Sequence, residues 1–258
     1  MDWVVILLSS AIIFTAALVH AIAGFGFAQV SMGLLPLIRS ASSASIVFTF
    51  LAIVTNTRVW WRVREHFRWK EWIVPIAGLT AGLPIGVLFF KEMNEDAIRM
   101  AIALVLLIGV VLLASVRLSD RVKKRIEESE FKPGIITGVT VGFIAGILGG
   151  SVAIPGPPII LYGTFMVSAG IWRNEEMKAI FTAFFGSLMA YRATILIVSG
   201  DVTLTYLEEA LVLVVPLLIG AWVGIRIFNR VPPEKFRWLV LAMLTINALV
   251  LMITSIPE

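Results

Sequence analysis

The chain has 258 residues, of which 59% are hydrophobic and 15% are charged, and it contains no cysteine. Soluble domains are about 45–50% apolar and about 25% charged, so a water-soluble globular protein is excluded. The composition instead predicts an all-α, polytopic helical membrane protein whose surroundings are the lipid bilayer. We expect the net charge of +4 to come from Lys and Arg in cytoplasmic loops, and no nucleic-acid partner is expected.

Eight apolar stretches follow one another along the chain, separated by charged clusters and by Gly, Pro and Trp. They span residues 3–38, 43–61, 72–90, 97–116, 134–166, 178–199, 206–227 and 236–254. Six of them have the length of about 20 residues that crosses a bilayer once. The first and the fifth are too long for a single crossing, so we expect eight to ten membrane segments in all.

Both long stretches contain a break rich in glycine. The first break is the sequence Ala-Gly-Phe-Gly-Phe at 23–27, and the second covers 146–151 and is followed by three prolines within 154–158. In a helix interior glycine costs about 1 kcal/mol and proline about 3 kcal/mol relative to alanine. Each long stretch is therefore predicted to be a pair of shorter segments.

Features that recur in the same order indicate two homologous halves. Gly24 in the first break corresponds to Gly146 in the second, and Gly82 corresponds to Gly220, each of these two beginning a Gly-x-x-x-Gly motif. Glycine is common in every membrane helix, so chance recurrence is the alternative explanation. Because several element types keep the same order, we prefer an internal repeat.

Positive charge in the loops indicates how the halves are oriented. If each half crosses four times, alternate loops carry 10 and 9 Lys and Arg residues, which is no bias. If each long stretch instead adds a second membrane segment, each half has an odd number of crossings. Of the Lys and Arg residues in the loops, 16 then lie on one side of the membrane and three on the other. By the positive-inside rule, residues 1–116 and 133–258 are inverted repeats, the basic linker 117–132 is cytoplasmic and both termini are extracytoplasmic.

Two arginines lie well within the apolar stretches, whereas all 17 Asp and Glu lie in loops or near helix ends. These arginines, Arg58 and Arg192, occupy equivalent positions of the two halves. A guanidinium can hold an anion through two parallel hydrogen bonds, so both are candidate substrate ligands. Arg58 lies one turn from Arg62 and can alternatively extend to the cytoplasmic interface.

The breaks are the second candidate for the substrate site, because the ends of broken helices present unpaired backbone N–H groups that suit an anion. The candidate ligands at the breaks and beside the arginines are His20, Gly24, Phe25, Gly26, Gln29, Ser31, Asn56, Gly149, Gly150, Ser151 and Tyr191. The glycines alternatively serve close helix packing through small residues, and His20 alternatively makes a hydrogen bond in helix packing. We expect no metal site and no cofactor.

The Gly-Phe-Gly-Phe break and the later Gly-x-x-x-Gly-x-x-Gly-Gly-Ser motif resemble those of the TauE/SafE family of sulfite and organosulfonate exporters. The resemblance covers the whole chain. It implies a carrier of the bacterial inner membrane that moves small sulfur-containing or carboxylate anions.

The leading hypothesis is a secondary transporter that exports a small anion by alternating access of two inverted halves, with sulfite or an organosulfonate as the substrate that the resemblance implies. An anion channel or a carrier for small carboxylates are the alternatives. An enzyme is not expected, since no stretch carries a metal cluster, a nucleophile–base pair or a Walker sequence. The oligomeric state stays open, with a homodimer among the options.

Overall fold

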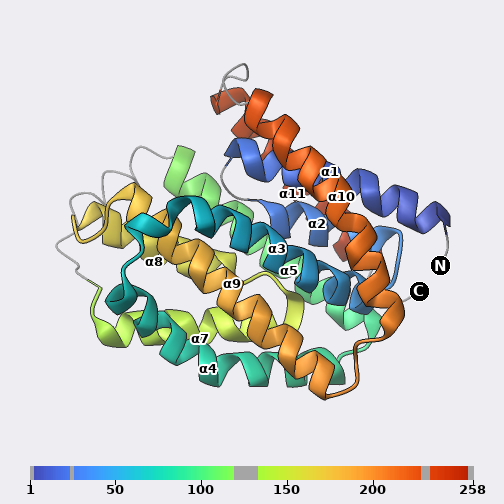
Figure 1. Ribbon diagram of the computed structural model, residues 1–258, viewed down its shortest axis with the longest axis horizontal. Helices are drawn as coiled ribbons and strands as arrows, with labels where there is room; N and C mark the ends of the chain where they lie inside the picture. Colours follow the sequence, from blue (N-terminus) through green and yellow to red (C-terminus); the bar gives the residue numbers. More distant parts are fainter. Residues whose placement is uncertain (1–2, 24–25, 119–132, 228–232, 255–258) are drawn as a thin grey trace. The chain divides into compact units, whose positions relative to one another are not determined.

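The computed structural model describes residues 3–23, 26–118, 133–227 and 233–254, and no strand occurs in these ranges (Figure 1). The first half contains α1 (Trp3–Ala23), α2 (Phe27–Leu34), the 3₁₀ turn η1 (Leu35–Leu37), α3 (Ala41–Val63), the 3₁₀ turn η2 (Arg64–His66), α4 (Trp69–Glu92) and α5 (Glu95–Leu118). The second half contains α7 (Ile135–Val152), α8 (Gly156–Ser168), α9 (Asn174–Val198), α10 (Leu204–Ile227) and α11 (Pro233–Thr254).

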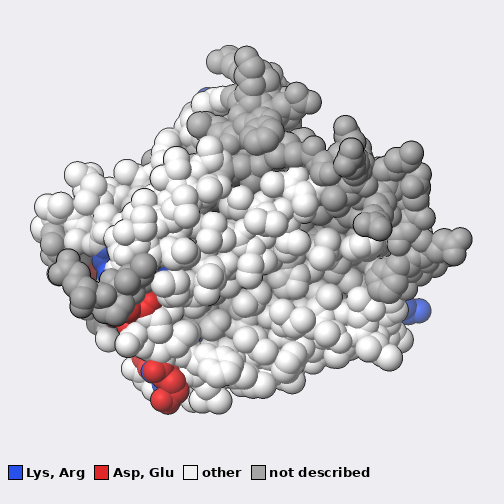
Figure 2. Space-filling model, turned by 180° about the vertical axis from the view of Figure 1, so that it is seen from behind, with Lys and Arg blue, Asp and Glu red and all other residues white. Residues whose placement is uncertain are grey.

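Six helices within the described ranges are long and apolar enough to cross a membrane, namely α1, α3 with η2, α4, α7, α9 and α10. On the face drawn in Figure 2, most of the described surface is neither acidic nor basic. Large apolar side chains are exposed along these helices, among them Trp3, Leu88 and Leu211, and a water-soluble protein does not expose so many. The chain is therefore a multi-pass helical membrane protein, as the composition predicts, while the count of eight apolar stretches stays a prediction.

Each long apolar stretch is divided into two helices, as the glycines and prolines predict. The first division lies between α1 and α2, where Gly26 has a φ of 101° in the left-handed region that favours glycine. Gly24 and Phe25 lie outside the described residues. The second division lies between α7 and α8, where Ala153 ends α7 with a φ of 60° and Pro155 precedes α8.

The position predicted for the second break is wrong. Residues 146–151 are helical, because α7 continues to Val152, and the break falls at 153–155 instead. Gly146 and Gly150 lie within α7 and do not interrupt it. They serve packing instead, because their Cα atoms lie against the backbone of α4. The packing alternative accounts for both of these residues.

The described residues form two compact units, and each unit takes helices from both sequence halves. The α1–α10 unit contains α1, α2, α10, α11 and the first parts of α3 and α5. The α4–α7 unit contains α4, α7, α8, the remaining parts of α3 and α5 and nearly all of α9. This division by contacts does not test whether residues 1–116 and 133–258 have equivalent folds, so the inverted repeats stay a prediction.

Glycine brings α4 and α7 into backbone contact along much of their length (Figure 1). A methyl group on Gly82 would overlap the carbonyl oxygen of Phe143, and one on Gly86 would overlap the carbonyl oxygen of Ile147. From the other side, a methyl group on Gly142 would overlap the carbonyl oxygen of Pro75. Small residues of this kind drive helix association in membranes, where there is no hydrophobic gain from helix contact.

The α1–α10 unit contains a contact of the same kind. A methyl group on Gly220 would overlap the carbonyl oxygen of Phe14, and one on Gly224 would lie 2.8 Å from the carbonyl oxygen of Leu18. Phe14 and Leu18 have the same spacing as the two α7 residues that Gly82 and Gly86 contact. In each unit, therefore, the fourth α-helix of one half packs through Gly-x-x-x-Gly on the first helix of the other half.

Candidate functional site

Arg192 lies in α9 with 0% of its surface exposed, next to the end of α7. Its Nε donates a hydrogen bond of 3.0 Å to the carbonyl oxygen of Gly150, and its Cζ lies 5.0 Å from the centre of the Phe90 ring. Gly150 is within the last turn of α7, where carbonyl groups have no partner inside the helix. A cation there is stabilised by the negative end of the helix dipole, so Arg192 is held where the helix breaks.

Other predicted residues of the α4–α7 unit pack around α7 and α9. Gly149 faces α9, and a methyl group on it would lie 2.7 Å from the side chain of Leu188. The Ser151 hydroxyl donates a hydrogen bond of 2.8 Å to the carbonyl oxygen of Ile147, so it is engaged within its own helix. Asn56 of α3 lies beside α9, 3.5 Å from where a methyl group on Gly186 would be.

Arg58 and Tyr191 are half-buried, and the Arg192 contacts with Gly150 and Phe90 involve neither of them. The Nη1 atom of Arg58 is buried and has no hydrogen-bond partner within the part of the chain that the structure describes. A buried guanidinium nitrogen without a partner is costly. It therefore marks Arg58 as a place where a further hydrogen-bond acceptor would be stabilising.

The first break brings together a different group, in the α1–α10 unit. The His20 ring packs edge-to-face against Phe27 with 6.2 Å between ring centres, across the turn at Gly26. Gly26, the residue before α2, has no side chain that could cap the helix, so the first backbone N–H groups of α2 point out of the helix. Gln29 and Ser31 of α2 are buried, and the Ser31 hydroxyl has no hydrogen-bond partner among the described residues.

Asn247 is a buried polar residue that sequence reasoning missed. It lies in α11 with 6% of its surface exposed, and its Nδ2 is 3.2 Å from where a methyl group on Gly33 would be. Its Nδ2 has no hydrogen-bond partner within the described ranges. An amide in the middle of the stretch 236–254 was the signal available, because polar side chains inside a membrane segment face the protein interior.

The predicted ligands are thus divided between the two compact units. The α1–α10 unit holds His20, Gly26, Gln29 and Ser31. The α4–α7 unit holds Asn56, Arg58, Gly149, Gly150, Ser151, Tyr191 and Arg192. Each unit therefore contains one helix break, with the buried Gln29 and Ser31 just after the first break and the buried Ser151 and Arg192 at the second.

Comparison with known proteins identifies the family. A family model described as sulfite exporter TauE/SafE matches residues 9–251, nearly the whole chain. The chain belongs to the TauE/SafE family. No curated protein and no solved structure matches the chain. Membership confirms the resemblance that the two breaks indicate, and it makes the chain a membrane transporter of an exporter family, in agreement with the expectation that it is not an enzyme.

This TauE/SafE chain also contains an ion pair that joins its two halves. Arg39, just before α3, and Glu209 of α10 lie 2.6 Å apart, with side chains that are 8% and 11% exposed. The Arg39 Nε also donates a hydrogen bond of 2.9 Å to the Ser43 hydroxyl. At the same helix end, Glu95 accepts a hydrogen bond of 2.5 Å from the backbone N–H of Ala41.

A second polar network joins the halves in the α4–α7 unit. Glu71 accepts a hydrogen bond of 3.0 Å from the Trp172 indole, and Arg68 lies 3.6 Å from Glu176. Glu71 and Glu209 have the same separation in sequence as Gly82 and Gly220, so the networks occupy equivalent places in the predicted repeat. That recurrence is the signal by which the TauE/SafE sequence could have revealed them.

Proposed function

We propose that this member of the TauE/SafE family is a secondary transporter that exports sulfite or an organosulfonate by alternating access. The observation that carries the proposal is the position of Arg192. Its guanidinium is completely buried in the α4–α7 unit and lies beside the break between α7 and α8. A fixed positive charge next to an interrupted helix is the arrangement in which transporters hold an anionic substrate.

The surroundings of Arg192 support an anion over a cation. Within the described residues of the α4–α7 unit, Arg192 is the charged side chain that is fully buried, whereas Glu71 and Glu176 are partly exposed and lie beside Arg68, so the buried charge is positive. The α1–α10 unit separately presents the first backbone N–H groups of α2, a kind of donor that binds anions, because Gly26 brings no capping side chain. Sulfite and sulfonate oxygens match the geometry of both kinds of donor.

The inverted arrangement of the halves is part of the same proposal. It is supported by the two glycine contacts, Gly82 on Phe143 and Gly220 on Phe14, which repeat one packing motif in separate units. It is also supported by the 16-to-3 distribution of Lys and Arg between the two sides. We propose a cytoplasmic linker at 117–132 and extracytoplasmic termini in a bacterial inner membrane.

Labelling measures this topology directly, since the natural chain has no cysteine to give background. Single cysteines at Ser129 and Ser255 are expected to react with an impermeant reagent from opposite sides of the membrane. The same sidedness for both positions would exclude the inverted arrangement.

Flux into vesicles tests the transport mechanism. Purified protein is reconstituted into proteoliposomes whose lumen contains unlabelled sulfite. The initial rate of entry of labelled sulfite is then measured as a function of the external sulfite concentration. A carrier is expected to saturate and to show accelerated exchange, whereas a channel conducts without either. Parallel assays with taurine, sulfoacetate and simple carboxylates identify the substrate class. A carboxylate preference would replace the proposed substrate, and unsaturable conductance would replace the carrier with a channel.

A further inference from the structure

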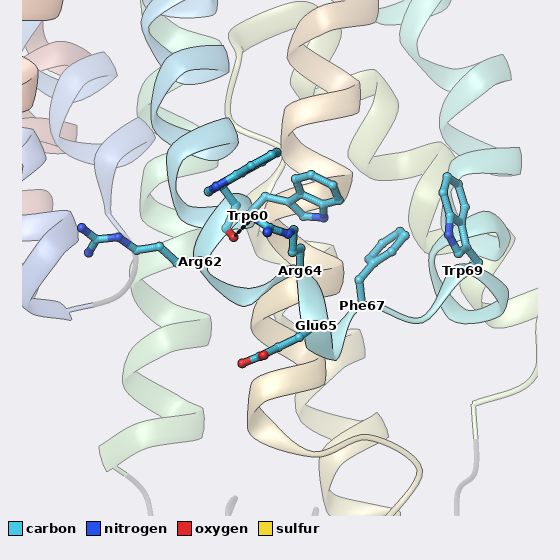
Figure 3. Close-up of a pocket in the computed structure, with 7 residues that line it drawn as sticks. Trp60, Arg62, Arg64, Glu65, Phe67 and Trp69 are labelled. Atoms are coloured by element: carbon cyan, nitrogen blue, oxygen red, sulfur yellow. Dashed lines mark hydrogen bonds between the residues drawn. The ribbon is translucent and has the colours of Figure 1, made fainter.

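A pocket of about 600 Å³ lies at the turn that joins α3 to α4 through η2 (Figure 3). The turn connects two helices that are each long and apolar enough to cross a membrane, so it lies where the bilayer ends. The pocket is lined by Trp60, Trp61, Arg62, Arg64, Glu65, Phe67 and Trp69. Neither Arg192 nor the helix breaks of the proposed transport site belong to it.

Aromatic rings form one wall of the pocket. Phe67 lies at its centre, with its ring 6.1 Å from that of Trp60 and 5.1 Å from that of Trp69, both edge-to-face. Trp61 and Trp69 are 63% and 68% exposed. Indole rings exposed at the end of a membrane helix are typical of the headgroup region, where an apolar body and a polar N–H group are both accommodated.

Arginine supplies the charge of the pocket. The Arg64 Cζ lies 3.9 Å from the centre of the Trp61 ring, and its Nη1 donates a hydrogen bond of 2.9 Å to the Trp61 carbonyl oxygen. Stacking and hydrogen bond together fix the guanidinium at the aromatic wall while the side chain stays exposed. Figure 3 shows Arg62 extending away from these rings.

One acidic side chain also lines the pocket, and it does not cancel this charge. Glu65 is 76% exposed and lies 3.5 Å from the imidazole Nε2 of His66. In Figure 3 its carboxylate points away from the rings of Phe67 and Trp69. The aromatic side of the pocket is therefore electropositive, which favours an anion.

We propose that this pocket binds the headgroup of an anionic phospholipid. The phosphate oxygens accept hydrogen bonds from the Arg64 guanidinium, and the glycerol and the first acyl carbons pack on Trp61, Phe67 and Trp69. A soluble phosphate would satisfy the arginine alone, whereas a lipid also covers the exposed rings at the depth where lipid is present. The proposal is independent of the transported substrate.

Lipid retention by the purified full chain tests the proposal. The protein is equilibrated with phosphatidylglycerol and phosphatidylcholine in equal amounts, and bound lipid is counted by native mass spectrometry. We expect preferential retention of phosphatidylglycerol, and an approximately tenfold loss of this preference in Arg64→Gln, because one charge-assisted contact is removed. Arg62→Gln is expected to lose less, and Glu65→Gln, which removes the negative charge, is expected to strengthen retention.

Arg226→Gln is the matched control. Its Cζ lies 3.6 Å from the centre of the Trp222 ring at the end of α10, so it is also an exposed arginine stacked on an indole, but it does not line the pocket. It is expected to retain phosphatidylglycerol like the parent. Equal losses in Arg64→Gln and Arg226→Gln, or no loss in either, would overturn the proposal.

The source of the phosphate is separated by competition. Glycerol 3-phosphate has the same phosphate group without acyl chains, and we expect it to displace the lipid only weakly. Displacement as efficient as that by phosphatidylglycerol would make the pocket a site for soluble phosphate compounds and would overturn the lipid proposal. The melting temperature of each variant serves as the folding control.

Discussion

The Arg39 Nη2 atom lies 2.6 Å from Glu209 Oε2 in the interior of the α1–α10 unit, although the two residues are far apart in the sequence. Both side chains are about nine-tenths buried, so each depends on the other to compensate for lost hydration. The pair connects the start of α3 in the first half with α10 in the second. Its removal therefore acts on the connection between the halves.

We expect Arg39→Met or Glu209→Leu alone to destabilise the protein by about 3–5 kcal/mol, because one buried charge is left without a partner. The double variant should be more stable than either single variant, since both charges are then gone. Thermal unfolding in one detergent measures all three. Arg173→Met is the control, because Arg173 is 70% exposed in its pair with Glu176 and should change stability by less than about 1 kcal/mol. Additive losses in the double variant would show that Arg39 and Glu209 are not coupled.

Close packing of α4 on α7 predicts a large effect of a single methyl group. Gly82→Ala should destabilise by about 1–3 kcal/mol, because its Cβ would meet the backbone of Phe143, which cannot move as a side chain does. Gly109→Ala, in the interior of α5, is the control. Its Cβ would lie 3.5 Å from Pro157, an ordinary contact, and alanine favours the helix. Equal effects of the two substitutions on melting temperature would contradict backbone contact between α4 and α7.

Neighbouring glycines of α7 should differ in their tolerance of substitution. A Cβ on Gly150 would lie 2.6 Å from the carbonyl oxygen of Leu83, whereas the atoms nearest to a Cβ on Gly149 belong to the side chain of Leu188, which is flexible. Gly150→Ala should therefore lower the melting temperature more than Gly149→Ala. If Gly149→Ala instead abolishes transport without loss of stability, Gly149 has the substrate role that its sequence position suggests.

Substrate affinity tests the role of Arg192. If Arg192 binds the anion, Arg192→Ala should weaken sulfite binding by about ten- to a hundredfold, the loss of one charge-assisted contact. Arg192→Lys should recover only part, because a single ammonium replaces a planar fork. Titration calorimetry on folded protein measures both. Thr194→Ala is the control and should leave sulfite affinity unchanged, because the exposed Thr194 hydroxyl donates its hydrogen bond to the carbonyl oxygen of Ala190 in the same helix. Unchanged sulfite affinity in a folded Arg192→Ala variant would exclude Arg192 as a substrate ligand and leave it the structural role of hydrogen bonding to the end of α7.

Composition and punctuation by glycine and proline were sufficient to predict a helical membrane protein with two divided stretches. They could not place the second break, because a glycine that interrupts a helix and a glycine that lets two helices touch look the same in one sequence. Gly146 is of the second kind, since its Cα lies against α4. The break at 153–155 coincides with Pro155, which cannot donate a backbone hydrogen bond.

The burial of Arg192 was predictable from the sequence, whereas its contacts were not, and its role as a substrate ligand stays a prediction. An arginine in the middle of an apolar stretch was expected to be buried, and Arg192 is buried. Its acceptor, the Gly150 carbonyl group, is a backbone atom, so no side-chain pattern marks it. Arg39 and Glu209 both lie near helix ends, where solvated charges are ordinary, and only the fold reveals that they are paired inside the protein.

During synthesis, α4 is made before its partner α7. The delay is longer for α1, because the chain from Ala23 to Leu204 must be made before its partner α10 begins. At about 5–20 residues per second, that wait is on the order of ten to forty seconds. Until α7 has been made, the glycine face of α4 around Gly82 is open to lipid or to the insertion machinery. The α1–α10 unit can be completed only after α10 and α11 have been made, so α1 is without its main partner helix during most of the synthesis of the chain.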